Sequence, residues 1–216
     1  MKYQAVIFDL DGTLVNTLED IAESVNANLR KLGLPVHSVD SFRLKVGNGN
    51  RMMVSRSLPT DQQHLLDELL AMQLEYYAEH FCDHSQIYPG INEMLAELKQ
   101  QNLQLAVLSN KPDHLTQKLV SHLFDDSTFA TVRGHLPDAI HKPDPGAALA
   151  IAAHLNIEPA EIVFVGDTAM DMQTANSAGM FAVGVTWGYR SRDELTAAGA
   201  DCLIDQPAEL MAKLLF

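Results

Sequence analysis

The sequence predicts an α/β fold: a Rossmann-like, doubly wound parallel sheet that carries an inserted α-helical cap domain. Apolar segments alternate with amphipathic segments over residues 90–204, which is the pattern of parallel strands joined by helices. Residues 15–84 show helical spacing only, and they follow an apolar strand at 5–8 that needs a sheet to join. We therefore expect a discontinuous core, residues 1–14 and 85–216, and a cap formed by residues 15–84.

The expected cap contains three helical regions. Apolar residues recur at helical spacing over residues 17–33, and Gly33 ends that pattern. Residues 39–58 predict short helical pieces that the glycine-rich segment 47–50 interrupts. Leucines three and four residues apart predict a further helix over residues 61–81.

The expected core continues with five strands, each followed or preceded by a helix. In chain order we predict a helix at 90–101, a strand at 103–108, a helix at 113–123, a strand at 129–132, a helix at 144–155, a strand at 162–165, a helix at 169–178, and strands at 181–185 and 202–204, each followed by a short helix.

Composition excludes several classes of function. The formal charge of −13 leaves no basic excess to neutralise phosphates, so we expect no nucleic-acid partner. Cys82 and Cys202 are too few and too far apart for a disulfide framework. No charged leader with an apolar segment opens the chain, and no apolar run reaches membrane-spanning length. We expect a cytoplasmic protein without a membrane partner, either a monomer or a homodimer.

Two acidic residues follow the first predicted strand. Asp9 and Asp11 come directly after the apolar segment 5–8, and Gly12 then permits a tight turn. If the strand geometry continued, both carboxylates would lie on one side, where they would need a cation or a shared proton. Open α/β sheets bind ligands at the carboxyl ends of their strands, so both acids are candidate site residues. The alternative is a solvated acidic turn.

Two later segments supply groups that suit a phosphate. Ser109 and Asn110 follow the strand at 103–108 and offer a hydroxyl and backbone N–H donors. Lys142 precedes Pro143, whose ring restricts the backbone, so this lysine is a positioned point charge. Considered alone, the first segment could be an ordinary turn and the second a surface lysine beside a helix.

A third segment adds two more carboxylates. Asp167 follows the strand at 162–165, and Asp171 lies four residues later, where a helix would place both on one face. Alone, Asp167 could simply cap that helix. Together with Asp9 and Asp11, these acids make an oxygen-rich cluster of the kind that selects Mg²⁺.

These four motifs, in this order, resemble those of the haloacid dehalogenase-like superfamily. The motifs are Asp9-Leu10-Asp11-Gly12-Thr13, Ser109-Asn110, Lys142-Pro143 and the segment from Gly166 to Asp171. The likeness covers nearly the whole chain and includes a small helical cap between the first two motifs. Within the superfamily the chain most resembles the phosphoglycolate phosphatases, on residues 9–15, Val46-Gly47-Asn48-Gly49 and Tyr88-Pro89-Gly90. One departure is Asn16, where those enzymes often carry an acid.

The resemblance implies a Mg²⁺-dependent phosphatase that acts through an aspartyl-phosphate intermediate. Asp9 would attack phosphorus, and Asp11 would protonate the leaving alkoxide and then activate water. The implied metal ligands are Asp9, Asp11 through its backbone carbonyl, and Asp167, with Asp171 holding metal-bound waters or the lysine. The implied phosphate-binding residues are Thr13, Ser109, Asn110 and Lys142.

The cap suggests that the substrate is a small anion. Residues 30–56 contain six of the chain's fifteen Lys and Arg residues and a single acid, Asp40. A phosphorylated carboxylate such as 2-phosphoglycolate would fit this local positive potential, whereas the alternative is a solvated helical surface. The candidate contacts lie around the glycine-rich turn and are Lys45, Gly47, Asn48 and Arg51.

Other functions could use the same motifs. A sugar phosphomutase resembling β-phosphoglucomutase would share them, because a phosphorylated aspartate can return its phosphoryl group to an alcohol. A phosphonate hydrolase would need a Schiff-base lysine in the cap, for which Lys31 and Lys45 are available. A haloacid dehalogenase has no need for Asp11 or for a Mg²⁺ cluster. A catalytically silent binding module could also keep this fold, since fold does not determine activity.

Overall fold

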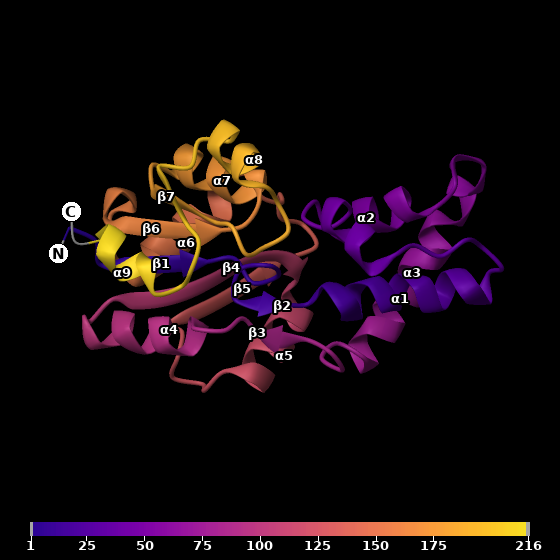
Figure 1. The fold of residues 1–216 in the computed structure, drawn as a ribbon, viewed down its shortest axis with the longest axis horizontal. Helices are drawn as coiled ribbons and strands as arrows, with labels where there is room; N and C mark the ends of the chain where they lie inside the picture. The colour runs from indigo at the N-terminus through magenta and orange to yellow at the C-terminus, as the bar shows by residue number, and fades with distance from the viewer. Residues whose placement is uncertain (1, 215–216) are drawn as a thin grey trace.

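The core of the protein is a six-stranded parallel sheet in the order β5-β4-β1-β6-β7-β8 (Figure 1). The computed structural model describes residues 2–214. Its main strands are β1 (Ala5–Phe8), β4 (Gln104–Pro112), β5 (Thr131–His135), β6 (Ile162–Gly166), β7 (Phe181–Val185) and β8 (Cys202–Ile204). β1 lies between β4 and β6 and pairs in parallel with both. The strand order reverses at β1, and such a point is where open α/β sheets bind ligands.

Helices cover both faces of this sheet. Side chains of a strand alternate in direction, so Val6 and Phe8 of β1 enter one hydrophobic cluster, while Ala5 and Ile7 enter another. Helices α4 (Ile91–Gln100), α5 (Asp113–Leu123) and α9 (Glu209–Leu214) pack into the first cluster. Helices α6 (Gly146–Leu155), α7 (Ala169–Ala178) and α8 (Arg192–Ala197) pack into the second, and a short 3₁₀ helix (Pro159–Glu161) precedes β6. The predicted doubly wound fold is confirmed.

A separate helical lobe lies beside the sheet, at the right of Figure 1. It consists of α1 (Leu18–Lys31), α2 (Asn50–Ser57), α3 (Leu66–Glu79) and two 3₁₀ helices, Val39–Leu44 and Thr60–Leu65. The apolar stripe of α1 packs with Phe42 and Leu69 in a third hydrophobic cluster. Leu115 of α5 and Tyr189 belong to this cluster too, so the helical lobe packs directly on the core.

A two-stranded antiparallel ladder joins the two lobes, and the sequence prediction missed it. β2 (Val15–Asn16) pairs with β3 (Gln86–Ile87), although we expected residues 15–84 to contain no strand. A strand of two residues is too short to show a period of two. Val15 is fully buried in the core cluster. The ladder therefore holds against the core both segments that connect it to the helical lobe.

The remaining differences concern the ends of elements. β4 continues past Leu108 to Pro112, β5 begins at Thr131 rather than at residue 129, and α6 begins at Gly146. Among residues 2–214, no helix has the length and apolar character needed to cross a membrane.

Candidate active site

Asp9 and Lys142 form a buried ion pair at the carboxyl end of β1. The backbone N–H of Asp9 donates to the Val165 carbonyl oxygen at 2.9 Å, which fixes the residue at the strand tip. The Lys142 Nζ donates to Asp9 Oδ1 and Asp171 Oδ1, both at 2.7 Å, and to the Leu108 carbonyl oxygen at 3.0 Å. Burial lowers the pKa of Lys142, but the two carboxylates more than offset this and raise it on balance, so the lysine stays charged.

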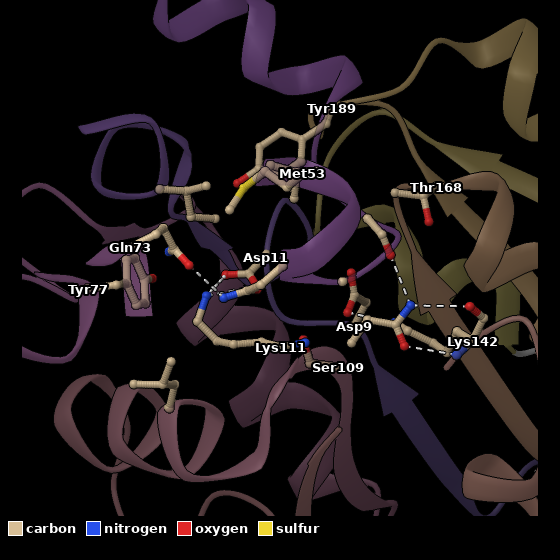
Figure 2. A pocket seen from close by; sticks show the side chains of 17 residues that line it. Asp9, Asp11, Met53, Gln73, Tyr77, Ser109, Lys111, Lys142, Thr168 and Tyr189 are labelled. Atoms are coloured by element: carbon tan, nitrogen blue, oxygen red, sulfur yellow. Dashed lines mark hydrogen bonds and ion pairs between the residues drawn. The ribbon is translucent and has the colours of Figure 1, made fainter. Parts of the chain in front are cut away.

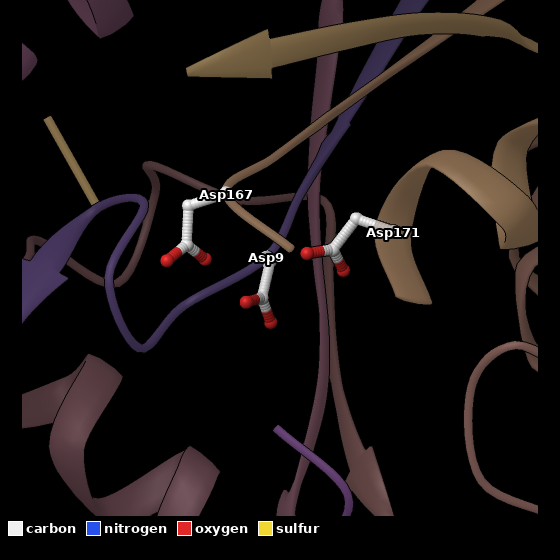
Figure 3. A group of neighbouring side chains, drawn as sticks. All are labelled: Asp9, Asp167 and Asp171. Atoms are coloured by element: carbon white, nitrogen blue, oxygen red, sulfur yellow. The ribbon is translucent and has the colours of Figure 1, made fainter. Parts of the chain in front are cut away.

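Three buried carboxylates meet at this edge of the sheet. Oxygens of Asp9, Asp167 and Asp171 lie within 4.8 Å of one another, and Figure 3 shows the three side chains converging. Burial is the main cause that raises the pKa of Asp9 to about 7 and the pKa of Asp167 well above its ordinary value. One lysine cannot neutralise three carboxylates, so the three can be ionised together only if a further cation is present. A hard, all-oxygen donor set of this kind fits Mg²⁺.

Glycines let other segments approach Asp167. A Cβ on Gly12, where φ is +90°, would overlap the Asp167 carboxylate, and a Cβ on Gly188 would overlap the same side chain. Asp167 Oδ2 accepts the backbone N–H of Tyr189 at 2.7 Å, and Oδ1 accepts the Thr13 hydroxyl at 3.3 Å. Two loops that are far apart in the sequence therefore hold Asp167 in one orientation.

We expect Mg²⁺ to stabilise the folded protein more strongly as pH rises. With a pKa of about 7, the folded Asp9 keeps a proton that the unfolded chain loses near pH 3.8, so the metal-free free energy of unfolding falls as pH rises between these values. A bound cation requires the ionised form and removes this loss. Thermal melts at pH 5 and pH 8 with and without Mg²⁺ should show a rise in Tm at pH 8 that is larger by several degrees.

The variant Asp167→Ala separates this effect from general salt stabilisation. It should lose most of the Mg²⁺-dependent rise in Tm and should require much more Mg²⁺ for activity. Equal rises at both pH values, or an unchanged metal requirement in Asp167→Ala, would remove these residues from the ligand set.

Asp11 faces a second lysine rather than the acid cluster. Lys111 Nζ donates to the two carboxylate oxygens of Asp11 at 2.8 and 2.9 Å, and the Thr17 hydroxyl donates to Oδ1 at 2.7 Å. The chain turns after β1, where the N–H groups of residues 13–15 all donate to the Leu10 carbonyl oxygen. Strand geometry therefore does not continue, and the Asp9 and Asp11 side chains pair with different lysines. A metal contact from Asp11 could come only from its backbone, as the resemblance implied.

A cavity of about 50 Å³ lies between the sheet edge and the helical lobe. Figure 2 shows Asp9, Lys142 and Thr168 at one end, Tyr77 and Gln73 at the other, and Asp11 and Lys111 between them. Apolar walls come from residues of both lobes, among them Ile21, Val46, Met53 and Leu115. The helical lobe thus forms part of the cavity wall, and the cavity has a charged end and a mixed end.

The predicted phosphate-binding residues occupy different positions. Ser109 lines the cavity, and its Oγ accepts the backbone N–H of Lys111 at 3.2 Å. Asn110 also lines the cavity, but its side chain accepts the Lys142 N–H and donates to the Gly47 carbonyl oxygen. Thr13 directs its hydroxyl at Asp167. Ser109 and Lys142 are therefore the side chains best placed for phosphate, whereas Asn110 ties the Lys142 loop to the helical lobe.

Of the four cap residues that we expected to contact substrate, only Gly47 lines the cavity. Asn48 does not line it and directs its amide to the Met170 sulfur at 3.3 Å. Arg51 pairs with the exposed Asp67 at 2.6 Å, and Lys45 lies over the Phe42 ring. None of the six basic residues at 30–56 lines the cavity. Arg43 comes near its wall, because it donates to the Gly188 carbonyl oxygen at 2.8 Å and lies over the ring of Tyr189.

Sequence reasoning overlooked several cavity residues, above all Lys111 and Tyr77. Lys111 follows Ser109-Asn110 directly, so the motif itself could have indicated it. Tyr77 and Gln73 are buried and lie four residues apart on α3, a spacing that places them on one helix face. Tyr189 is also part of the wall.

Comparison with known proteins agrees with the fold and the motifs. The model of a family described as haloacid dehalogenase-like hydrolase matches residues 6–185. A phosphoglycolate phosphatase of Mannheimia succiniciproducens is 34% identical over 97% of both chains, and one of Haemophilus influenzae is 32% identical over 99% of both. A solved structure of a predicted phosphoglycolate phosphatase from Haemophilus somnus superposes with a TM-score of 0.88 at 30% identity, over 99% of this chain and 98% of that one.

These matches confirm the resemblance that the motifs indicated. The relatives are named as phosphatases, the matching model is one of hydrolases, and both agree with the predicted class of phosphoric monoester hydrolase. The match extends over the helical lobe as well as the sheet, because it covers nearly the whole length of each relative. The chain belongs to the haloacid dehalogenase-like hydrolase family.

Proposed function

We propose that this protein is a Mg²⁺-dependent phosphatase that hydrolyses a small phosphorylated metabolite, with 2-phosphoglycolate as the first candidate. The observation that supports it best is the buried Asp9 carboxylate, which lies between the Lys142 ammonium and two further acids and lines the cavity between the two lobes. The names of the relatives in Mannheimia succiniciproducens and Haemophilus influenzae support the choice of substrate.

In the first half of the reaction, an Asp9 carboxylate oxygen attacks phosphorus, and an aspartyl-phosphate forms as the ester P–O bond breaks. Asp11 gives its proton to the leaving alkoxide, which departs as an alcohol. In the second half, Asp11 takes a proton from water, and the water oxygen displaces Asp9 to yield inorganic phosphate. Asp11 is available for both transfers because it lines the same cavity as Asp9.

Lys142 and Ser109 hold the non-bridging phosphate oxygens in this scheme. Asp9, Asp167 and the Asp11 backbone carbonyl would hold the Mg²⁺, and Asp171 would hold metal-bound waters or the lysine. When bound, the ion offsets the repulsion between Asp9 and the phosphate and stabilises negative charge in the transition state. Asp171 also orients Lys142, since its Oδ1 accepts the ammonium while its Oδ2 accepts the Thr168 N–H and hydroxyl.

We further propose that residues 15–84 act as a cap on the core of residues 1–14 and 85–216. The separate hydrophobic cluster of the helical lobe supports this division. Hydrogen bonds hold the lobe against the core, because Arg190 and Asn110 donate to the Val46 and Gly47 carbonyl oxygens. A closed cap would exclude water other than the attacking molecule.

The free thiols of both cysteines agree with the cytoplasmic location that we expect.

Phosphate release from a panel of phosphorylated metabolites, measured with Mg²⁺ as kcat/KM, tests the proposal. We expect 2-phosphoglycolate to give the highest value and chelation of the metal to abolish it. Isomerisation of a hexose phosphate that depends on a bisphosphate activator, with little phosphate release, would instead identify a mutase. Absence of turnover throughout the panel in a folded, metal-loaded protein would indicate a silent binding module.

A further inference from the structure

Beyond Asp9, the cavity wall contains two buried polar groups that the proposed chemistry does not use. Lys111 and Tyr77 are 6% and 2% exposed, and both line the cavity. The Lys111 ammonium lies 4.7 Å from the centre of the Tyr77 ring, and Figure 2 shows the two side chains beside Asp11. A lysine and a tyrosine from different lobes thus meet next to the residue that donates the proton.

Lys111 is the cation available to the part of the substrate that is not phosphate. Among the described residues that line the cavity, Lys142 is the other cation, and Lys142 is engaged by Asp9 and Asp171. Two donors of the Lys111 ammonium point to the Asp11 carboxylate, and an ammonium has three. One donor therefore remains for a ligand.

Tyr77 supplies a second donor. Its hydroxyl is buried and has no hydrogen-bond partner, which is rare for a polar group inside a protein. Burial raises the pKa of Tyr77 to about 12, so the hydroxyl keeps its proton and can donate it. A buried donor without a partner, in the wall of a cavity, marks a position that a ligand acceptor can satisfy.

We propose that Lys111 and Tyr77 bind the carboxylate of a substrate in which a single carbon separates that carboxylate from the phosphate ester oxygen. The inference rests on the proposed function, because it assumes that Asp11 protonates that ester oxygen. Lys111 lies within 2.9 Å of the Asp11 carboxylate, so a group held by Lys111 is adjacent to the leaving oxygen.

Charge complementarity explains why an anion suits this position. Lys111 is a buried ammonium with one donor left over, and the Tyr77 hydroxyl is a buried donor without a partner. A substrate carboxylate can accept from both donors and carries the charge opposite to that of Lys111. A neutral sugar hydroxyl supplies no such charge, so the site selects phosphorylated short-chain acids over sugar phosphates. Lys111 and Tyr77 would therefore be specificity-determining residues.

A pair of matched esters tests this assignment. 2-Phosphoglycolate and ethyl phosphate have the same number of carbons, but ethyl phosphate has no carboxylate, so the ratio of their kcat/KM values isolates that group. We expect Tyr77→Phe to reduce the ratio about tenfold, the effect of one hydrogen bond to a charged group, and Lys111→Met to reduce it more. In Tyr77→Phe, most of the loss on the carboxylate ester should appear as a higher KM rather than as a lower kcat.

Control variants remove the same groups outside the cavity. Tyr76→Phe changes the neighbouring tyrosine, which stacks on His80 and does not line the cavity, and Lys45→Met removes a cap lysine outside it. Both should leave the ratio unchanged. A ratio that falls in Lys45→Met but not in Tyr77→Phe would overturn the proposal and support recognition from the cap surface.

A binding measurement keeps the test independent of turnover. Calorimetry should show that the product glycolate, in the presence of Mg²⁺ and inorganic phosphate, binds Tyr77→Phe about tenfold more weakly than the unmodified protein. Suppose that the unmodified protein hydrolyses both esters and that Tyr77→Phe changes neither the ratio nor the glycolate affinity. The proposed carboxylate site would then be wrong, whereas the proposed phosphatase activity would be supported. If no ester is hydrolysed, the proposed function fails, and equal glycolate affinities would reject the carboxylate site as well.

Discussion

Replacement of Asp9 by asparagine is expected to reduce phosphate release by about 10⁴-fold or more, which is the scale of losing a covalent nucleophile. The amide keeps the size of the side chain and can still accept the Lys142 ammonium, but it has no anionic oxygen to attack phosphorus. Above pH 7 the variant also removes one of three buried negative charges, so its Tm without metal should not fall there. Phosphate assays and thermal melts on the same preparation would measure both effects.

Asp67→Asn is the matched control for this change. Asp67 is exposed and pairs with Arg51 on the helical lobe, so the same substitution there should alter neither activity nor Tm. If Asp9→Asn retained substantial activity, with contaminating phosphatase excluded, the aspartyl-phosphate mechanism would be wrong. A Tm far below that of the unmodified protein would point to a structural role instead.

Asp11→Asn should lower kcat by about 10²–10⁴-fold while phosphate binding persists. Asparagine cannot transfer a proton, whereas the ion pair of Lys142 with Asp9 and Asp171 is independent of Asp11. An ester with a good leaving group separates the two proton transfers. 4-Nitrophenyl phosphate needs little protonation, so the variant should release about one equivalent of nitrophenol quickly and then stall as the phosphorylated protein.

Acid quenching of the stalled reaction should leave phosphate bound to the Asp11→Asn protein, and to Asp9 by peptide mapping. Equal losses on the aryl and alkyl esters, together with no burst, would show that Asp11 does not carry the proton. Because Asp11→Asn also removes the partner of Lys111, Lys111→Met is the informative comparison. It alters the same pair but retains a proton donor, so it should still complete both half-reactions.

Much of the site could be predicted because parallel strands place their carboxyl ends at one edge of a sheet. Asp9, Ser109 and Asp167 each follow an apolar segment of the sequence, and each lies at or directly after a strand of the central sheet. Short motifs at the ends of buried strands therefore located the acid cluster before any distance was known. The role of Asp171 as part of the helix capping arrangement with Thr168 was less evident.

The same reasoning did not predict which residues of the helical lobe line the cavity. Charge count directed attention to Lys45 and Arg51, yet Arg51 pairs with Asp67, and neither residue lines the cavity. Which face of a short helix points to a neighbouring lobe depends on how the two lobes pack, and charge along the chain does not record that packing. The same limit applies to Tyr77, whose helical spacing indicates burial but not a cavity wall.

Local sequence patterns predict the doubly wound sheet, the insertion of a helical segment after the first strand, and the acids and lysine that gather at the sheet edge. Hydrophobic periodicity sets the elements, and parallel topology sets where their ends meet. By contrast, no local pattern predicts that Asp11 pairs with Lys111 or that Tyr77 faces them from the other lobe. Those contacts join residues from three distant segments, and their positions depend on the packing of the two lobes against each other.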